Sequence, residues 1–150
     1  MYKDTITLFN RKEGDKGDTW YPTVLHNVHL HMDRAAILAK YGADSADNAV
    51  LNVRYTQDGD KKVVGAKPWL SPKLWDKLLE PEKALTFRPG AQFDFFWLGD
   101  WGNEEPVYDA DYFSDTDFYT YMNCTHDCVF AISSVGGPYS LIPHFEIMGK

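Results

Sequence analysis

Three of the chain's five histidines lie within the stretch HNVHLHMD, residues 26–33, which ends in an aspartate. His29, His31 and Asp33 are each two positions apart, so on an extended strand all three side chains would project from the same face. Imidazole and carboxylate groups are common ligands of transition metals, and His126 or His144 could complete a tetrahedral or octahedral shell. The spacing therefore permits a metal centre.

The same stretch also has an explanation without a metal. Val28, Leu30 and Met32 alternate with the polar residues, which is the pattern of a strand that buries one face and leaves the other in water. A His-x-His pair is a short motif, and the chain has no HExxH helix. We therefore interpret His29 and His31 as residues on the polar face of a strand, and we expect no cofactor.

Two cysteines and a histidine lie together in the stretch CTHDC. Cys124 and Cys128 form a Cys-x3-Cys pair, but a zinc ribbon needs a second pair, which this chain of two cysteines does not have. A nucleophilic thiol activated by His126 is the other possibility, although neighbours along an extended chain point to opposite faces. We expect small, buried cysteines with free thiols, as is usual in a reducing compartment.

Four aspartates follow one another in the aromatic stretch YDADYFSDTDFYTYM: Asp109, Asp111, Asp115 and Asp117. A calcium loop of the EF-hand type needs a glycine at its turn and a glutamate at its twelfth position, and this stretch has neither. It is predicted to be a solvated acidic loop with aromatic anchors, and its part DTDFYTYM could make a helical turn or a loop. The chain also lacks the GxSxG, phosphate-loop and GxGxxG motifs, so we identify no catalytic residue and expect no enzyme.

Length, composition and charge narrow the class of protein. The chain has 150 residues, of which 44% are hydrophobic and 25% are charged, as is typical of one folded domain. A net charge of −7 gives no overall attraction for DNA or RNA, so we expect no sequence-specific binding of nucleic acid. We find no signal peptide and no apolar run near the ~18 residues of a membrane span. The prediction is a single β-rich domain over residues 1–150 with no membrane contact.

The elements that would position these residues are mainly short strands. DTITLFN and WYPTVLHNVHLHM are separated by RKEGDKGDT, which predicts a long hairpin with a charged loop. AVLNVRYT and KKVVGA flank Asp58-Gly59, a dipeptide typical of a tight hairpin turn. Between these hairpins, DRAAILAKYGADSADNA contains a short run that is compatible with a helix.

The second half of the chain continues this pattern. SPKLWDKLLE, with Ser71 as N-cap and Pro72 at the first position, predicts a helix that ends before Pro81. Its apolar residues Leu74, Trp75, Leu78 and Leu79 are expected along one side. Two strands are predicted around the Pro-Gly turn of KALTFRPGAQFDFFWLGDW, and two more around residues 136–138. Seven or eight strands and one or two short helices predict a mainly β fold, a small antiparallel barrel or sandwich.

Aromatic residues make up 15% of the chain, so some are expected near the surface, where interfaces favour them. We predict partner contacts in the charged hairpin loop from Arg11 to Asp18 and in the acidic-aromatic segment from Tyr108 to Tyr121. The alternative for the second segment is that its rings only pack onto the barrel. The residues predicted to bind partners are Arg11, Lys12, Lys16, Tyr112, Phe113, Tyr119 and Tyr121.

Five stretches together resemble a family of small uncharacterised proteins of tailed phages and prophages of Firmicutes-type bacteria. They are DTITLFNR, the long stretch DTWYPTVLHNVHLHMDRAAILAKYGADSADNAVL, FDFFWLGDW, MNCTHDCVFAISSVG and the C-terminal SLIPHFEIMGK. The opening TITLFNR…DTWYPTVLHNV is also similar to the first hairpin of phage head-closure and head-tail joining barrels. The resemblance runs from the first strand to the last residue.

This resemblance implies a non-enzymatic virion structural protein, such as a head-tail connector, a head-closure protein or a tail-completion protein. Its partners would be further copies of itself in a homo-oligomeric ring and neighbouring phage head or tail proteins. It would be located in the cytoplasm of the bacterial host during assembly and then in the virion. Two alternatives remain open: a metal-dependent, cupin-like enzyme built on His29, His31 and Asp33, and a phage-encoded binding module that acts on a host protein.

Overall fold

The computed structural model describes residues 2–32, 49–90 and 94–150. Its strands are β1 (Asp4–Lys12), β2 (Thr19–Met32), β3 (Ala49–Arg54), β4 (Thr56–Asp58), β5 (Lys61–Val64), β6 (Lys67–Trp69), β7 (Phe95–Leu98), β8 (Val107–Tyr108), β9 (Val129–Tyr139) and β10 (His144–Gly149). Its helices are α2 (Pro72–Asp76) and α3 (Phe118–Thr125), with 3-10 helices η1 (Pro81–Lys83) and η2 (Asp109–Asp115). The predicted run compatible with a helix, within residues 34–48, lies outside the described residues.

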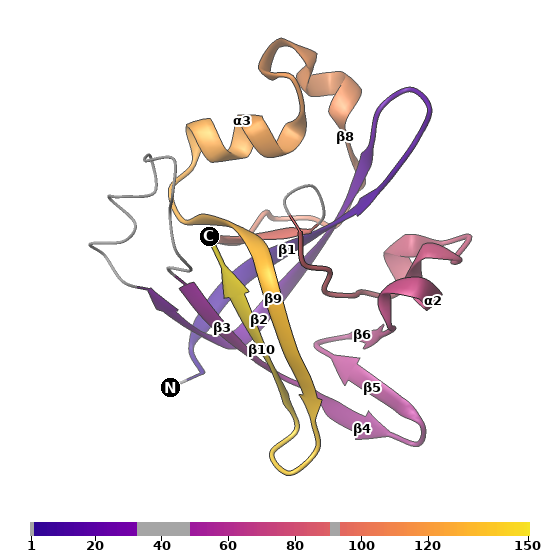
Figure 1. Ribbon diagram of the computed structural model, residues 1–150, viewed down its shortest axis with the longest axis vertical. Coiled ribbons are helices and arrows are strands. Elements are labelled where there is room, and N and C mark those ends of the chain that lie inside the picture. The colour runs from indigo at the N-terminus through magenta and orange to yellow at the C-terminus, as the bar shows by residue number, and fades with distance from the viewer. Residues whose placement is uncertain (1, 33–48, 91–93) are drawn as a thin grey trace.

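Six strands close into an antiparallel barrel (Figure 1). The order is β1-β7-β9-β10-β3-β2, and β1 also pairs with β2, which joins the two edges of the sheet. Strand β8 extends the sheet beyond β2, while β4, β5 and β6 form a separate three-stranded meander. The predicted mainly β fold is confirmed, and of the two predicted forms, a small antiparallel barrel or a sandwich, the structure is the barrel.

Because side chains point alternately to the two faces of a strand, every second side chain of a regular strand enters the barrel and fills it. In β1, Ile6 and Leu8 face the interior, and in β2, Leu25, Val28 and Leu30 do the same. Three fully buried rings, Phe96, Phe130 and Phe145, occupy the interior with the aliphatic residues. The centre of the barrel is therefore a close-packed core, because the side chains of a barrel with few strands are enough to fill it.

A β-bulge in β2 shifts its alternation by one residue. Val28 pairs with Asp4 and Leu25 pairs with Ile6, so three steps along β2 match two along β1. Asn27 absorbs the extra residue with a φ of 57°, a left-handed conformation that asparagine tolerates better than most residues. Residues on both sides of the bulge can therefore face the core.

Three predicted elements differ from the structure. The helix after Ser71 ends at Asp76, and of its predicted apolar side only Trp75 is buried, while Leu79 is 97% exposed. The segment before the Pro-Gly turn is not a strand, although Leu85 makes one bridge to Trp69 in β6. The final hairpin turns at residues 140–143, because β9 runs through Gly136-Gly137-Pro138 and stays paired with β10.

Candidate functional site

Several aromatic residues that lie outside the barrel interior form a second core on the outer face of the barrel. Its buried members are Phe9, Trp20, Phe95, Phe118, Met122 and Val129. The rings of Phe9 and Phe95 stack with centroids 4.8 Å apart, and Phe118 of α3 lies edge-on to Phe9 at 5.2 Å. Such aromatic pairs add specific geometry to the burial of apolar area, so they fix α3 against the barrel.

Asp109 joins the two segments in which partner contacts were predicted. Its backbone N–H donates to the carbonyl of Asp18 at 2.9 Å. Its carboxylate accepts hydrogen bonds from Trp20 Nε1 at 2.7 Å and from the Phe118 N–H at 3.0 Å. The charged hairpin loop and η2 therefore lie side by side at one end of the molecule (Figure 1). Residues 13–18 together with Asp109–Asp115 are named the end surface below.

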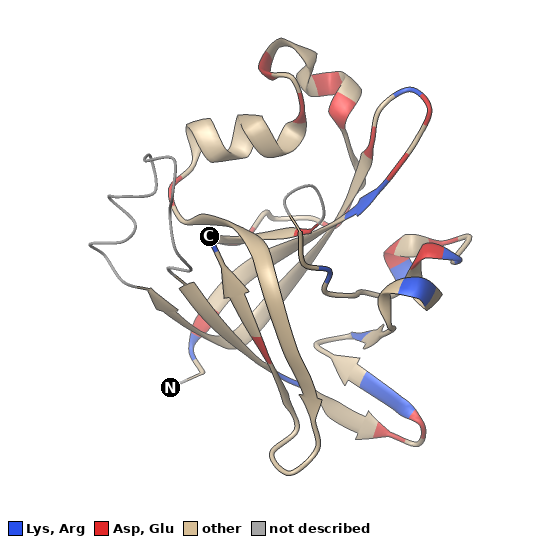
Figure 2. Cartoon of the chain, viewed as in Figure 1, with Lys and Arg blue, Asp and Glu red and all other residues tan. Residues whose placement is uncertain are grey.

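The end surface is strongly acidic (Figure 2). It contains six carboxylates and one lysine, Lys16, which gives a formal charge of −5. Arg11 lies at its base and forms ion pairs with Glu13 at 2.9 Å and with Asp18 at 2.8 Å. The surface would attract a basic partner and repel another acidic one.

The three basic residues predicted to bind partners have different surroundings. Arg11 has a side chain that is only 13% exposed and is held by the ion pairs just described. Lys12 turns toward α2, where its Nζ donates to the carbonyl of Asp76 and lies 5.5 Å from the centre of the Trp75 ring. Lys16 is exposed in the turn of the hairpin loop. Of the three, Lys16 is therefore the most accessible to a partner.

The four aromatic residues predicted to bind partners also differ in their surroundings. Tyr112 packs 5.0 Å from Phe118 and 4.6 Å from Tyr121, and Tyr119 packs 5.0 Å from Phe95. Burial raises the pKa of Tyr119 and of Tyr112 above the ordinary value for tyrosine.

Phe113 in η2 is 82% exposed. A large apolar ring left in water among carboxylates is the kind of side chain that binds in a pocket of a partner. Among the four predicted aromatic residues, Phe113 is the most exposed.

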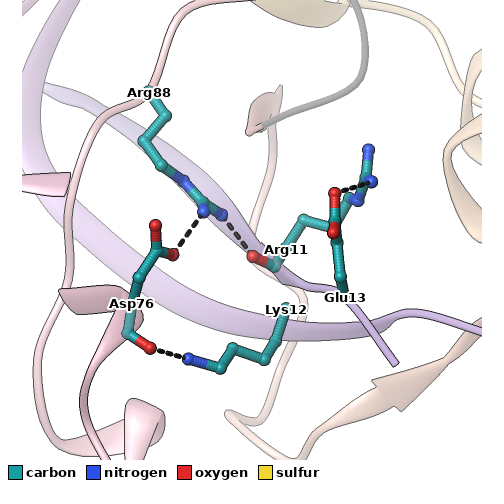
Figure 3. A pocket seen from close by; sticks show the side chains of 5 residues that line it. All are labelled: Arg11, Lys12, Glu13, Asp76 and Arg88. Carbon is teal, nitrogen blue, oxygen red and sulfur yellow. Dashed lines mark hydrogen bonds and ion pairs between the residues drawn. The ribbon is translucent and has the colours of Figure 1, made fainter. Parts of the chain in front are cut away.

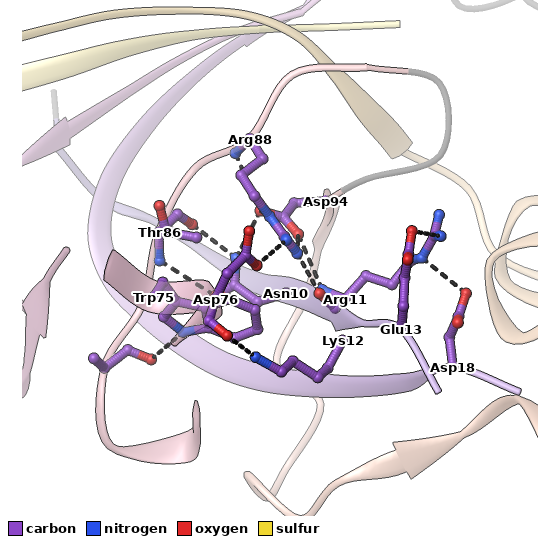
Figure 4. A network of polar contacts seen from close by, with 11 residues as sticks. Asn10, Arg11, Lys12, Glu13, Asp18, Trp75, Asp76, Thr86, Arg88 and Asp94 are labelled. Atoms are coloured by element: carbon purple, nitrogen blue, oxygen red, sulfur yellow. Dashed lines mark hydrogen bonds and ion pairs between the residues drawn. The ribbon is translucent and has the colours of Figure 1, made fainter. Parts of the chain in front are cut away.

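A buried ion pair between Arg88 and Asp94 lies beside β1 (Figure 4). The Asp94 side chain is fully buried, and one of its oxygens lies 2.8 Å from Arg88 Nη2. Its carboxylate also accepts hydrogen bonds from the backbone N–H groups of Arg11 and Arg88 and from Asn10 Nδ2. Burial raises the pKa of Asp94, and these donors act to lower it.

The guanidinium of Arg88 connects three parts of the fold. Beyond Asp94, it donates to Asp76 of α2 at 2.9 Å and to the carbonyl of Arg11 in β1. Its Cζ lies 4.8 Å from the centre of the Trp75 ring. This pair was not predicted from the sequence, where the only signal is two charged residues within the otherwise uncharged stretch LTFRPGAQFDFF.

A polar cavity of about 280 Å³ opens beside this pair (Figure 3). It is lined by Arg11, Lys12, Glu13, Asp76 and Arg88. The hydrogen bonds and ion pairs drawn in Figure 3 join these residues to one another, from the barrel to α2. We interpret the cavity as part of the packing contact between α2 and β1.

The histidines of the opening stretch lie on the outer face of the barrel. Val28 and Leu30 belong to the interior core, so the intervening His29 points away from it and lies 6.1 Å from the Tyr2 ring. His31 is exposed, and Asp33 lies outside the described residues. In the described part of the chain, no group of three or more His, Cys, Asp or Glu residues could hold a metal ion.

The two cysteines are free thiols, as predicted, but the prediction that both are buried is wrong. Cys124, on the last turn of α3, is exposed, and Cys128, immediately before β9, is half-buried. His126 packs edge-on against Trp97 at 5.2 Å, and its Nδ1 lies 2.8 Å from Thr125 Oγ1. The described contacts of His126 are therefore those of a side chain that packs against its neighbours in the fold.

The acidic run contains two aspartates with local structural roles. Asp117 is the N-cap of α3, and its carboxylate accepts a hydrogen bond from the Thr120 N–H at 2.7 Å. Asp109 holds η2 against Trp20, as described above. The stretch is therefore a 3-10 helix followed by an α-helix. The predicted solvated loop is wrong, whereas the helical turn, one of the two alternatives for DTDFYTYM, is present at the start of α3.

Fold and site together define a small closed β barrel with an external aromatic core and an acidic end surface. The chain belongs to a family of unknown function, DUF6751, whose model matches residues 1–150. Comparison with curated proteins gave no match, and comparison with solved structures gave none. None of the described helices is both long enough and apolar enough to span a membrane.

Proposed function

We propose that the protein is a non-enzymatic structural component of a tailed-phage particle, acting as a head-tail connector, a head-closure protein or a tail-completion protein. It assembles into a ring with copies of itself and binds neighbouring head or tail proteins. The phage assignment rests on the full-length resemblance described above. In this proposal, the protein is present in the cytoplasm of the bacterial host during assembly and then in the particle.

The closed, filled barrel supports a structural role. Phe96, Phe130 and Phe145 are fully buried in its interior and pack with the aliphatic core residues, as expected of a rigid body. His29 and His31, on which a cupin-like metal centre would depend, lie on the opposite face of β2 from the interior. An adaptor needs such a rigid body to hold its contact surfaces at a fixed separation.

The observation that carries the proposal is the end surface. Two segments about ninety residues apart in the sequence meet there through Asp109, Asp18 and Trp20. Around the exposed ring of Phe113 they gather a formal charge of −5, so apolar burial and charge can act together in recognition. We infer that a head or tail protein binds this surface with a basic patch that surrounds an apolar pocket.

The experiment is deletion of the gene from its resident prophage, followed by induction and electron microscopy of the particles. We expect separated heads and tails, and we expect the unaltered gene supplied in trans to restore joining. Phe113→Ser should fail to restore it at normal folded stability. Leu79→Ser removes an exposed leucine from the segment between α2 and η1, so it is the matched control and should restore joining. Normal joining without the gene would contradict the proposal.

A further inference from the structure

The turn between β9 and β10 is an exposed apolar tip at the opposite end of the molecule from the end surface (Figure 1). Leu141 is 95% exposed and Ile142 is 68% exposed. Turns usually carry polar residues or glycine, because they lie in water. Two adjacent aliphatic side chains at the most exposed point of a hairpin therefore indicate a contact that covers them.

The base of this turn is held in one conformation by contacts with Tyr55 and His144. The Tyr55 hydroxyl donates to the Tyr139 carbonyl at 2.7 Å, and the Tyr55 N–H donates to the Pro143 carbonyl at 3.3 Å. His144 stacks on the Tyr139 ring at 5.0 Å, and its Nδ1 lies 2.5 Å from the Ile142 carbonyl. A preorganised turn loses little conformational freedom when it binds, which favours association.

A groove lies against the tip and is formed by the same hairpin. Its volume is about 420 Å³, and it is lined by Tyr139, Leu141, Ile142, His144 and Glu146. Leu141 and Ile142 are thus two of the five side chains that line this groove, so the tip and the groove form one apolar surface. Two copies related by a two-fold axis could bury this surface against each other, because a two-fold contact uses the same surface on both partners.

Charge also favours a second copy as the occupant. Residues 136–149 contain one carboxylate, Glu146, and neither lysine nor arginine. In Figure 2 the turn itself carries no charged residue. Two tips can therefore meet with little repulsion, whereas two end surfaces, each with a formal charge of −5, repel one another. Nucleic acid or an anionic membrane would require basic residues, which the tip lacks.

We propose that the β9–β10 turn is a self-association surface through which two copies of the chain pair tip to tip. A contact made by one hairpin is far smaller than the ~800 Å² per partner of a standard interface, so the pairing is weak and reversible. A two-fold contact closes on itself, so it joins two barrels or two rings and does not build the ring itself. The inference is independent of the phage role proposed above.

The test is analytical ultracentrifugation of the full chain from micromolar to millimolar concentration. We expect the mass of the smallest assembly to double as concentration rises, and we expect Leu141→Ser with Ile142→Ser to weaken this step at least tenfold. Both side chains are exposed, so the double variant should retain the thermal unfolding midpoint of the wild type. No doubling in the wild type, or equal doubling in the double variant, would overturn the inference.

Two matched controls locate the contact. Leu79→Ser removes an equally exposed leucine from the segment between α2 and η1, and it should leave the doubling unchanged. Phe113→Ser alters the end surface and should also leave it unchanged. If either control abolished doubling while the tip variant did not, the contact would lie elsewhere and the inference would be wrong. Failure of tip pairing would not affect the particle experiment, because that experiment measures the joining of heads to tails.

Discussion

Replacement of Asp94 by alanine should lower the free energy of unfolding more than the loss of any exposed ion pair would. The carboxylate is fully buried and accepts five hydrogen bonds, from Asn10, Arg11 and Arg88. Asp94→Ala leaves the guanidinium of Arg88, itself 8% exposed, without its principal countercharge. Removal of one partner from a buried pair costs about 3–5 kcal/mol, because the other charge stays buried and uncompensated. Since small domains are stable by about 5–15 kcal/mol, much of the free energy of unfolding would be lost.

The measurement is urea-induced unfolding monitored by tryptophan fluorescence, together with the thermal midpoint. For a chain of this length the midpoint should fall by about 6–20 °C. Glu13→Ala is the matched control, because Glu13 pairs with Arg11 through a side chain that is 77% exposed. It should cost less than about 1 kcal/mol. Equal losses in Asp94→Ala and Glu13→Ala would refute the reasoning that burial gives the Arg88–Asp94 pair its importance.

Three further predictions concern single side chains. Burial raises the pKa of Tyr119 in the folded state. The contribution of the neutral Tyr119 side chain to stability is therefore complete below pH ~10, and it declines as pH rises through the folded pKa. Tyr119→Phe should reduce this alkaline loss, measured by urea unfolding at successive pH values, and an unchanged loss would contradict it. Asp117→Ala should lower the unfolding free energy by about 1 kcal/mol, because the N-cap bond to Thr120 is lost; no change would show that the cap contributes nothing. Cys124 is exposed and should react with a thiol reagent faster than the half-buried Cys128, as followed in the two Cys→Ser variants, and the reverse order would refute this placement.

The strands were predictable because alternation is a local property of the sequence. Ile6 and Leu8 in β1, and Val28 and Leu30 in β2, show which face is buried without knowledge of what covers it. The same is true of the tight turn at Gly59, which has a φ of 62°. Whether the sheet closes was not predictable, because closure depends on β1 pairing with β2 on one side and with β7 on the other.

The candidate site was predicted in part. Its two segments were identified from charge and aromatic content, but their meeting at Asp109 depends on contacts across about ninety residues that no local pattern encodes. The Arg88–Asp94 pair was missed for a related reason. Charged residues on either side of a turn usually lie in water, and only the complete fold shows that these two are buried.

The tip formed by Leu141 and Ile142 was missed because the turn was predicted to begin at residue 136, four residues too early. Gly136-Gly137-Pro138 has the composition of a turn. In the structure these residues stay within β9, and the chain reverses over residues 140–143. With the turn placed at the glycines, the two aliphatic residues would have belonged to a strand, and their exposure could not be anticipated.

The proposed role as a structural part of a tailed-phage particle requires that the protein be present in such particles. The most direct measurement is quantitative mass spectrometry of tailed particles purified by density gradient after induction of the resident prophage. We expect the chain at several copies per particle, in a constant ratio to the portal protein, as a ring requires. Intact, infectious tailed particles from which the chain is absent would contradict the proposed role.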